Sequence, residues 1–115
     1  MKHIIRITED SFFKGTYSGY GDLELYGNFQ GSLYVKNLYV KKSGVFTGYL
    51  SATNIIVEGE INADIQTENL HLKSTGVVDG EVMYRNIIID SGGMLKSHMV
   101  QNVSNMNNLI KLNKI

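Results

Sequence analysis

The apolar positions of the chain recur at an interval of 15 to 17 residues, in the pattern apolar-x-small-x-apolar. Successive side chains of a strand point to opposite faces, so residues two apart lie on one face. The small residues are Gly15, Gly31, Gly48, Ala63, Gly80 and Ser97; the apolar residues before them are Phe13, Phe29, Phe46, Ile61, Val78 and Leu95, and those after them are Tyr17, Leu33, Leu50, Ile65, Val82 and Met99. Each repeat is therefore expected to bury all three positions, with the small residue where the interior is tightest.

A second strand recurs out of phase with the first. Its inward pairs are Ile5/Ile7, Leu23/Leu25, Leu38/Val40, Ile55/Val57, Leu70/Leu72 and Ile87/Ile89, and five of the six follow Asp22, Asn37, Asn54, Asn69 or Asn86. Asn and Asp tolerate left-handed backbone angles and hydrogen-bond their own turns, so one in each repeat predicts a repeated corner. Stacked asparagines can also form a side-chain amide ladder, as they do in cross-β structures.

The length of the repeat predicts the architecture. Helical and leucine-rich repeats need about 20 to 47 residues and propeller blades about 40 or more. A repeat of 15 to 17 residues instead fits one coil of a three-sided β-helix. We therefore predict an all-β, single-domain β-solenoid of about six coils over residues 4–99, with an N-terminal tail (1–3) and a C-terminal tail (100–115) that is disordered or caps the last coil. The period does not determine the hand of the solenoid.

Composition narrows the classes of function. Hydrophobic residues make up 43% of the chain, enough for a core, and eleven Lys and Arg balance eleven Asp and Glu. Nucleic-acid binding draws much of its affinity from phosphate neutralisation, and the chain has no basic excess for it. There is no cysteine for a disulfide or a thiolate metal site. The chain starts without an apolar signal segment and no run approaches the ~20 residues of a membrane span, so a cytoplasmic protein is expected.

The side chains that could carry catalysis do not converge. His3 falls in the N-terminal tail, and His71 and His98 point outward from different strands of different coils. Asp64 and Glu81 occupy matching outward positions one coil apart, as on a solvated acidic face. The glycines of the repeat stand a whole coil apart, so they form no phosphate-binding loop. We expect no catalytic residue, no metal site and no cofactor.

Outward aromatic and apolar residues form a candidate binding surface. By phase, Tyr34, Tyr39 and Tyr49 point outward, and Ile56 and Ile88 lie on the same face as Tyr39. Such a patch can bind a partner or a glycan, although strand propensity alone also explains it. A module that reads a flat lattice needs one residue type along each column, whereas these columns are mixed.

The two ends of the solenoid carry the main functional prediction. A terminal coil presents unpaired backbone groups above an apolar interior, and natural proteins cover such edges with a helix, charge or proline. Proline is absent and no amphipathic helix precedes the first coil. We therefore expect end-to-end stacking through a polymerisation interface made of Ile5, Ile7, Phe13 and Tyr17 in the first coil and Ile87, Ile89, Leu95 and Met99 in the last. A C-terminal tail folded over the last coil would prevent this stacking.

Three segments resemble the bactofilin family: residues 21–33 (GDLELYGNFQGSL), 43–52 (SGVFTGYLSA) and 57–63 (VEGEINA). The resemblance covers roughly residues 5 to 99. It implies a right-handed β-helix and nucleotide-independent, nonpolar filaments formed by contacts between terminal coils. It also implies a role in bacterial cell shape near the inner face of the cell membrane, with peptidoglycan-modifying enzymes or membrane proteins as partners.

Two stretches depart from the family pattern. Leu95 stands where the family commonly has an aromatic residue that supports polymerisation near the last coil. Only residues 1–5 correspond to the N-terminal membrane-targeting segment that many members carry, which leaves little for peripheral membrane association.

The competing class is an enzyme of the hexapeptide β-helix kind, either an acyltransferase or a carbonic-anhydrase relative. Such enzymes need a strict six-residue period and a catalytic histidine, or three metal-binding histidines, at subunit contacts. The sequence has neither that register nor converging histidines. We therefore predict a structural scaffold that assembles with itself, not an enzyme.

Overall fold

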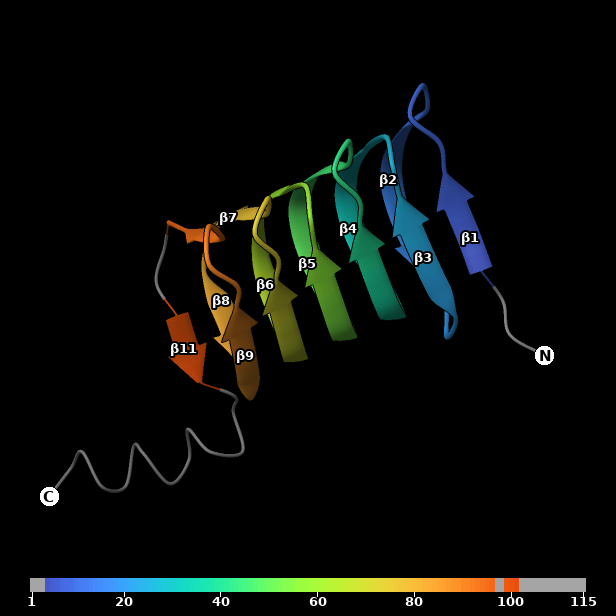
Figure 1. The fold of residues 1–115 in the computed structure, drawn as a ribbon. Helices are drawn as coiled ribbons and strands as arrows, with labels where there is room; N and C mark the ends of the chain where they lie inside the picture. The colour runs from blue at the N-terminus through green and yellow to red at the C-terminus, as the bar shows by residue number, and fades with distance from the viewer. Residues whose placement is uncertain (1–3, 97–98, 102–115) are drawn as a thin grey trace, which may run out of the picture.

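The computed structural model describes residues 4–96 and 99–101, and it is an all-β solenoid of about five turns. Its strands are β1 (Ile4–Ile7), β2 (Phe12–Ser18), β3 (Asp22–Leu25), β4 (Asn28–Val40), β5 (Val45–Val57), β6 (Glu60–Leu72), β7 (Val77–Asp79), β8 (Val82–Tyr84), β9 (Asn86–Ile89), β10 (Met94–Leu95) and β11 (Met99–Gln101). All their pairings are parallel. Figure 1 shows the coils stacked from β1 at the right to β9 and β11 at the left.

Each coil has three sides, which are most distinct near the C-terminal end. Along its length, β6 pairs first with β7, then with β8 and then with β9. Strands β4, β5 and β6 are each 13 residues long because they turn the same corners while staying paired with the neighbouring coil. The expected tail begins inside β11, and residues 1–3 and 102–115 lie outside the described residues.

The register of the coils is the one that the repeat predicts. Three columns of paired residues run along the stack: Phe13, Phe29, Phe46, Ile61, Val78 and Leu95; Tyr17, Leu33, Leu50, Ile65, Val82 and Met99; and Ile5, Leu23, Leu38, Ile55, Leu70 and Ile87. The expected fold class is thus confirmed. The expected number of coils is slightly too high, because six residues in a column enclose only five intervals.

The interior of the solenoid is one continuous apolar core. Leu25, Phe46, Leu50, Val57 and Leu72 have no exposed surface. Burying a side chain of this size stabilises the fold by about 1.5–3 kcal/mol. Burial decreases toward the terminal coils, where the inward side chains have a neighbouring coil on one side only.

The reason for the repeated glycines differs from the one expected. Gly15 and Gly48 are exposed, so the small residue does not mark the tightest part of the interior. Gly15, Gly31, Gly48 and Gly80 have φ of 131° to 140°, a region that L side chains rarely adopt. A Cβ on Gly48 would also lie 1.9 Å from the carbonyl oxygen of Gly31 in the preceding coil. Backbone conformation and close stacking therefore require glycine at this corner.

The predicted amide ladder is present at another corner. Asn86 Nδ2 donates to Asn69 Oδ1, Asn69 Nδ2 to Asn54 Oδ1 and Asn54 Nδ2 to Asn37 Oδ1, over 2.7 to 2.9 Å. Asn37 Nδ2 donates to the buried carboxylate of Asp22 over 2.7 Å. The left-handed backbone expected for these residues is wrong, because no described residue other than glycine has a positive φ. Asparagine is suited to this corner by its side-chain hydrogen bonds.

Candidate functional site at the two ends of the solenoid

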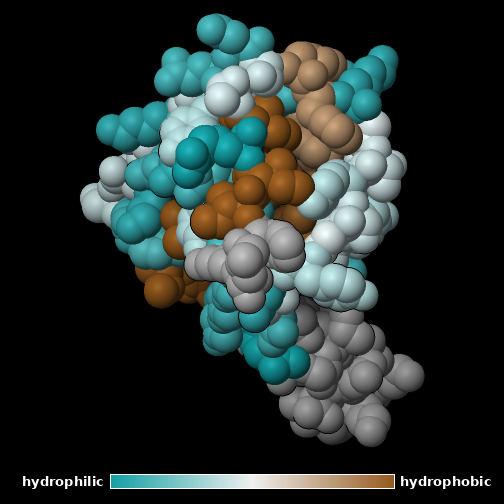
Figure 2. All heavy atoms as spheres, turned by 90° about the vertical axis from the view of Figure 1, so that its right-hand side faces the viewer, coloured by the Kyte–Doolittle hydropathy of each residue, from teal (hydrophilic) through white to brown (hydrophobic). Residues whose placement is uncertain are grey.

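Exposed apolar side chains gather at both ends of the described stack. Among the described residues, the large hydrophobic residues with exposed side chains are Ile4, Phe12 and Tyr20 in the first coil, Tyr34 in an inner coil, and Ile88, Ile89 and Met94 in the last. Figure 2 looks at the N-terminal end and shows hydrophobic residues in its middle, surrounded by hydrophilic ones. Apart from Tyr34, all of these exposed side chains therefore belong to the first or the last coil.

At the N-terminal end, the strands have one open edge each. Within residues 4–96 and 99–101, β1 pairs only with β3 and β2 only with β4. Ile7 is buried, whereas Ile5, Phe13 and Tyr17 are half-buried and pack against the core on one side. An open parallel edge above half-buried apolar side chains is a template for pairing with another chain.

An aromatic stack runs through the core to this end. The ring centroids of Phe13 and Phe29 are 4.6 Å apart and those of Phe29 and Phe46 are 5.1 Å apart, with interplanar angles of 21° and 18°. Phe29 and Phe46 are buried, so Phe13 is the outermost ring and is covered by the core on one side only. A further aromatic or apolar side chain can continue this stack.

At the C-terminal end, inward residues are only partly covered. Ile87 and Leu95 are half-buried against the core. Ile89 has inward phase, yet 44% of its surface is exposed, because β9 pairs only with β6 among the described strands. Met99 lies in β11 beside Val82, and the structure does not describe its side chain. The expected interface residues therefore fall on two separate ends, four at each.

Two exposed apolar residues at the ends, Phe12 and Met94, were not identified from the sequence. They occupy one outward column of paired residues: Phe12, Asn28, Val45, Glu60, Val77 and Met94. In the inner coils the residue of this column is polar or half-buried, whereas in the two terminal coils it is a large apolar residue with an exposed side chain. Outward phase made both residues look like ordinary strand surface. The signal that could have found them is that the two ends of this column carry larger apolar residues than its inner positions, which are asparagine, glutamate and valine.

Charged residues surround the apolar surfaces of the ends. Arg6 Nε lies 2.7 Å from Glu24 Oε1. The hydrogen bond to Glu24 and then its charge raise the pKa of Arg6 above the ordinary arginine value. Lys14 and Lys96 occupy equivalent positions in the first and last coils, because they directly follow Phe13 and Leu95 of one core column.

The described residues bring together no group of three or more metal-binding side chains. Of the three histidines, His71 contacts Asp90, with Nε2 3.0 Å from Oδ1, while His3 and His98 lie outside the described part. Asp64 Oδ1 accepts a hydrogen bond from the backbone N–H of Glu81 over 3.4 Å. In the same residues, no helix is long and apolar enough to cross a membrane.

Comparison with known proteins identifies the family. The family model described as "Bactofilin: Polymer-forming cytoskeletal" matches residues 5–100, which is most of the chain. No curated protein and no solved structure gives a significant match. Given the parallel solenoid, the open terminal coils and this match, the chain belongs to the bactofilin family of polymer-forming cytoskeletal proteins.

Proposed function

We propose that this protein is a structural scaffold that polymerises end to end through its terminal coils, without nucleotide. The observation that supports this proposal is the incomplete burial of inward apolar side chains in the two terminal coils, beside strand edges that have no partner among the described residues. A junction between two N-terminal ends would cover Ile5, Phe13 and Tyr17, and a junction between two C-terminal ends would cover Ile87, Ile89, Leu95 and Met99. Covering apolar surface contributes about 25 cal/mol per Å².

The positions of the lysines favour nonpolar filaments, in which like ends meet. A head-to-tail junction that continued the register would place Lys96 of one copy beside Lys14 of the next, and like charges directly opposite each other are destabilising. If two N-terminal ends meet about a two-fold axis that passes beside Phe13, the Phe13 rings of the two copies stack on each other. Such a junction would also place Lys14 over the ring of Phe12 in the other copy, which is a favourable cation–π arrangement. The exposure of Phe12 and Met94 supports this geometry.

The cellular role that we propose is support of cell shape or envelope organisation. Membership of a cytoskeletal family supports it. In this proposal the filaments lie in the cytoplasm at the inner face of the cell membrane. Their partners there are peptidoglycan-modifying enzymes or membrane proteins. Co-purification of such proteins with intact filaments, and not with an end-blocked variant, is the expected result.

End-blocking substitutions test the proposed polymer. Leu95→Arg should block the C-terminal end and Phe13→Arg the N-terminal end, because an unpaired charge buried in a junction is costly. In a nonpolar polymer each variant keeps one working end and should sediment as a dimer, whereas the double variant should be a monomer. Sedimentation velocity without nucleotide or metal measures this, with Thr47→Arg, on an exposed side of a middle coil, as the matched control.

Two outcomes would contradict the proposal. If both end-blocked variants sediment like the wild type, the terminal coils do not form the junctions. If each single variant is a monomer, the ends join head to tail and the filament is polar. Circular dichroism of each variant separates these outcomes from a failure to fold.

A further inference from the structure

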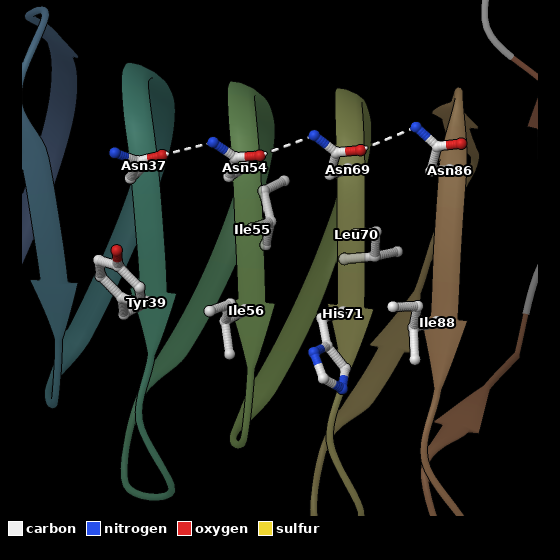
Figure 3. Close-up of a pocket in the computed structure, with 10 residues that line it drawn as sticks. All are labelled: Asn37, Tyr39, Asn54, Ile55, Ile56, Asn69, Leu70, His71, Asn86 and Ile88. Atoms are coloured by element: carbon white, nitrogen blue, oxygen red, sulfur yellow. Dashed lines mark hydrogen bonds between the residues drawn. The ribbon is translucent and has the colours of Figure 1, made fainter.

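A groove of about 400 Å³ runs along one side of the solenoid, over the last residues of β4, β5, β6 and over β9. Figure 3 shows its two walls. One wall is the ladder of hydrogen-bonded asparagines described above. The other is a row of outward side chains: Tyr39, Ile56, His71 and Ile88. Neither the family match nor the end contacts explain why three of these four outward positions carry large apolar or aromatic residues.

The row repeats once per coil, with a spacing fixed by the strand separation of about 4.8 Å. Tyr39, Ile56 and His71 are half-buried and Ile88 is 58% exposed. Two such rows can pack against each other with each side chain of one row facing one side chain of the other, provided that both rows have the same spacing. A second copy of the chain has that spacing by construction. Charges on this side then determine whether two copies attract or repel each other.

A column of charged residues of alternating sign borders the row. Lys41, Glu58, Lys73 and Asp90 occupy equivalent positions in successive coils, because their backbone N–H groups donate to the carbonyls of Leu25, Val40, Val57 and Leu72, which form one column of paired residues. The column lies beside the row: Lys41 Nζ is 5.9 Å from the ring centroid of Tyr39, and Asp90 Oδ1 is 3.0 Å from His71 Nε2. The order of charge is therefore plus, minus, plus, minus along the stack.

This order determines which arrangement of two copies is favourable. We propose that this side of the solenoid binds a second copy of the chain, laid antiparallel, about a two-fold axis between the coils of Ile56 and His71. Lys41 then faces Asp90 of the second copy and Glu58 faces its Lys73, so all four positions are complementary. In a parallel pair in register, each residue faces its own equivalent and all four contacts join like charges.

Two nearby arginines are paired with carboxylates of the same chain. Arg6 contacts Glu24 and Arg85 contacts Glu68, over 2.7 and 3.5 Å, within one chain. The row covers only four coils, about 14 Å of stack, so one pair of molecules binds weakly. Along two filaments the contact repeats, and repetition strengthens binding without any new contact. The repetition along filaments rests on the proposed end-to-end assembly, whereas the contact between two single molecules does not depend on it.

Cross-linking tests the antiparallel pair, because the chain has no cysteine of its own. Tyr39→Cys chains, marked by a mass tag, are mixed with Ile88→Cys chains and treated with a short bismaleimide that spans the ~10 Å between packed sheets. We expect the mixed dimer to be the main product. Dimers of Tyr39→Cys with itself would overturn the antiparallel arrangement. A yield no higher than that of Thr47→Cys mixed with Ile88→Cys would overturn the contact altogether.

A charge exchange tests the register of the pair. Glu58→Lys creates two contacts between like charges and should lower the cross-linking yield by roughly tenfold. Adding Lys73→Glu makes the facing charges opposite again and should restore the yield. If the double variant stays as low as Glu58→Lys, the proposed register is wrong. Because cross-linking reports on monomers as well as on filaments, this result is distinct from success or failure of end-to-end assembly.

Discussion

At the scale of single residues, the residue type at each position of a coil depends on the backbone conformation there and on contacts with the neighbouring coil. The amide ladder could be predicted, because one asparagine per repeat is visible in the sequence. The reason for the glycines could not be predicted, because the sequence does not give backbone φ angles. Each glycine also stands two residues from a core residue on either side, so its phase alone suggested that it is buried. Ala63 occupies the glycine station in its own coil without a positive φ. One coil therefore makes this corner differently from its neighbours.

Replacing a glycine of this column should destabilise the fold. Gly48→Ala forces a side chain into φ of 131° and toward the carbonyl of Gly31. Strain of this kind costs of order 1–3 kcal/mol. Urea unfolding should show this loss in the free energy of unfolding, whereas Thr47→Ala, one residue away and exposed, should stay within about 0.5 kcal/mol. An unchanged midpoint for Gly48→Ala would mean that this coil can adopt the corner conformation of Ala63.

The middle of the amide ladder should matter more than its end. Asn54→Ala removes the partner of both Asn37 Oδ1 and Asn69 Nδ2. Leaving such groups unpaired costs about 1–3 kcal/mol, less where water can reach them. Asn86→Ala removes only one hydrogen bond at an exposed position and should cost less. Equal shifts of the thermal midpoint in the two variants would show that the ladder adds no cooperative stability.

At the scale of elements, central and terminal strands have the same sequence pattern but different surroundings. β5 has a paired coil on each side, whereas β1, β2, β9, β10 and β11 have one on a single side among the described residues. Periodicity therefore predicted Ile89 as inward without showing that its surface is exposed. It also could not single out Phe12 and Met94, because only comparison along a column sets the terminal coils apart.

Substitutions at two rings of the aromatic stack should affect folding and assembly to different degrees. Phe46→Ala, in a middle coil, should lower the free energy of unfolding by about 3–5 kcal/mol, because it leaves a cavity in the core. Phe13→Ala should cost the fold less, since its ring is only half-buried, and should instead reduce the sedimentable fraction at a given protein concentration. If Phe13→Ala polymerises fully, this ring is not part of the junction.

At the scale of the whole molecule, the described residues form a solenoid whose two terminal coils each have strand edges without a paired neighbour. The chain carries no net charge that would keep copies apart. The fold class and register followed from the sequence because one period runs through six residues of every column. The sequence predicts the contacts between copies less completely, because these contacts depend on which surfaces remain exposed after folding. The surfaces that we propose for these contacts are the two ends and the grooved side.

X-ray fibre diffraction from aligned filaments of the purified protein, prepared without nucleotide or metal, is the most direct measurement of end-to-end assembly. If the coils stack along the filament, the strand spacing of about 4.8 Å gives a reflection on the meridian, parallel to the fibre axis. The same reflection on the equator would mean that the solenoids lie across the filament. Dispersed particles that form no filament would contradict end-to-end assembly altogether.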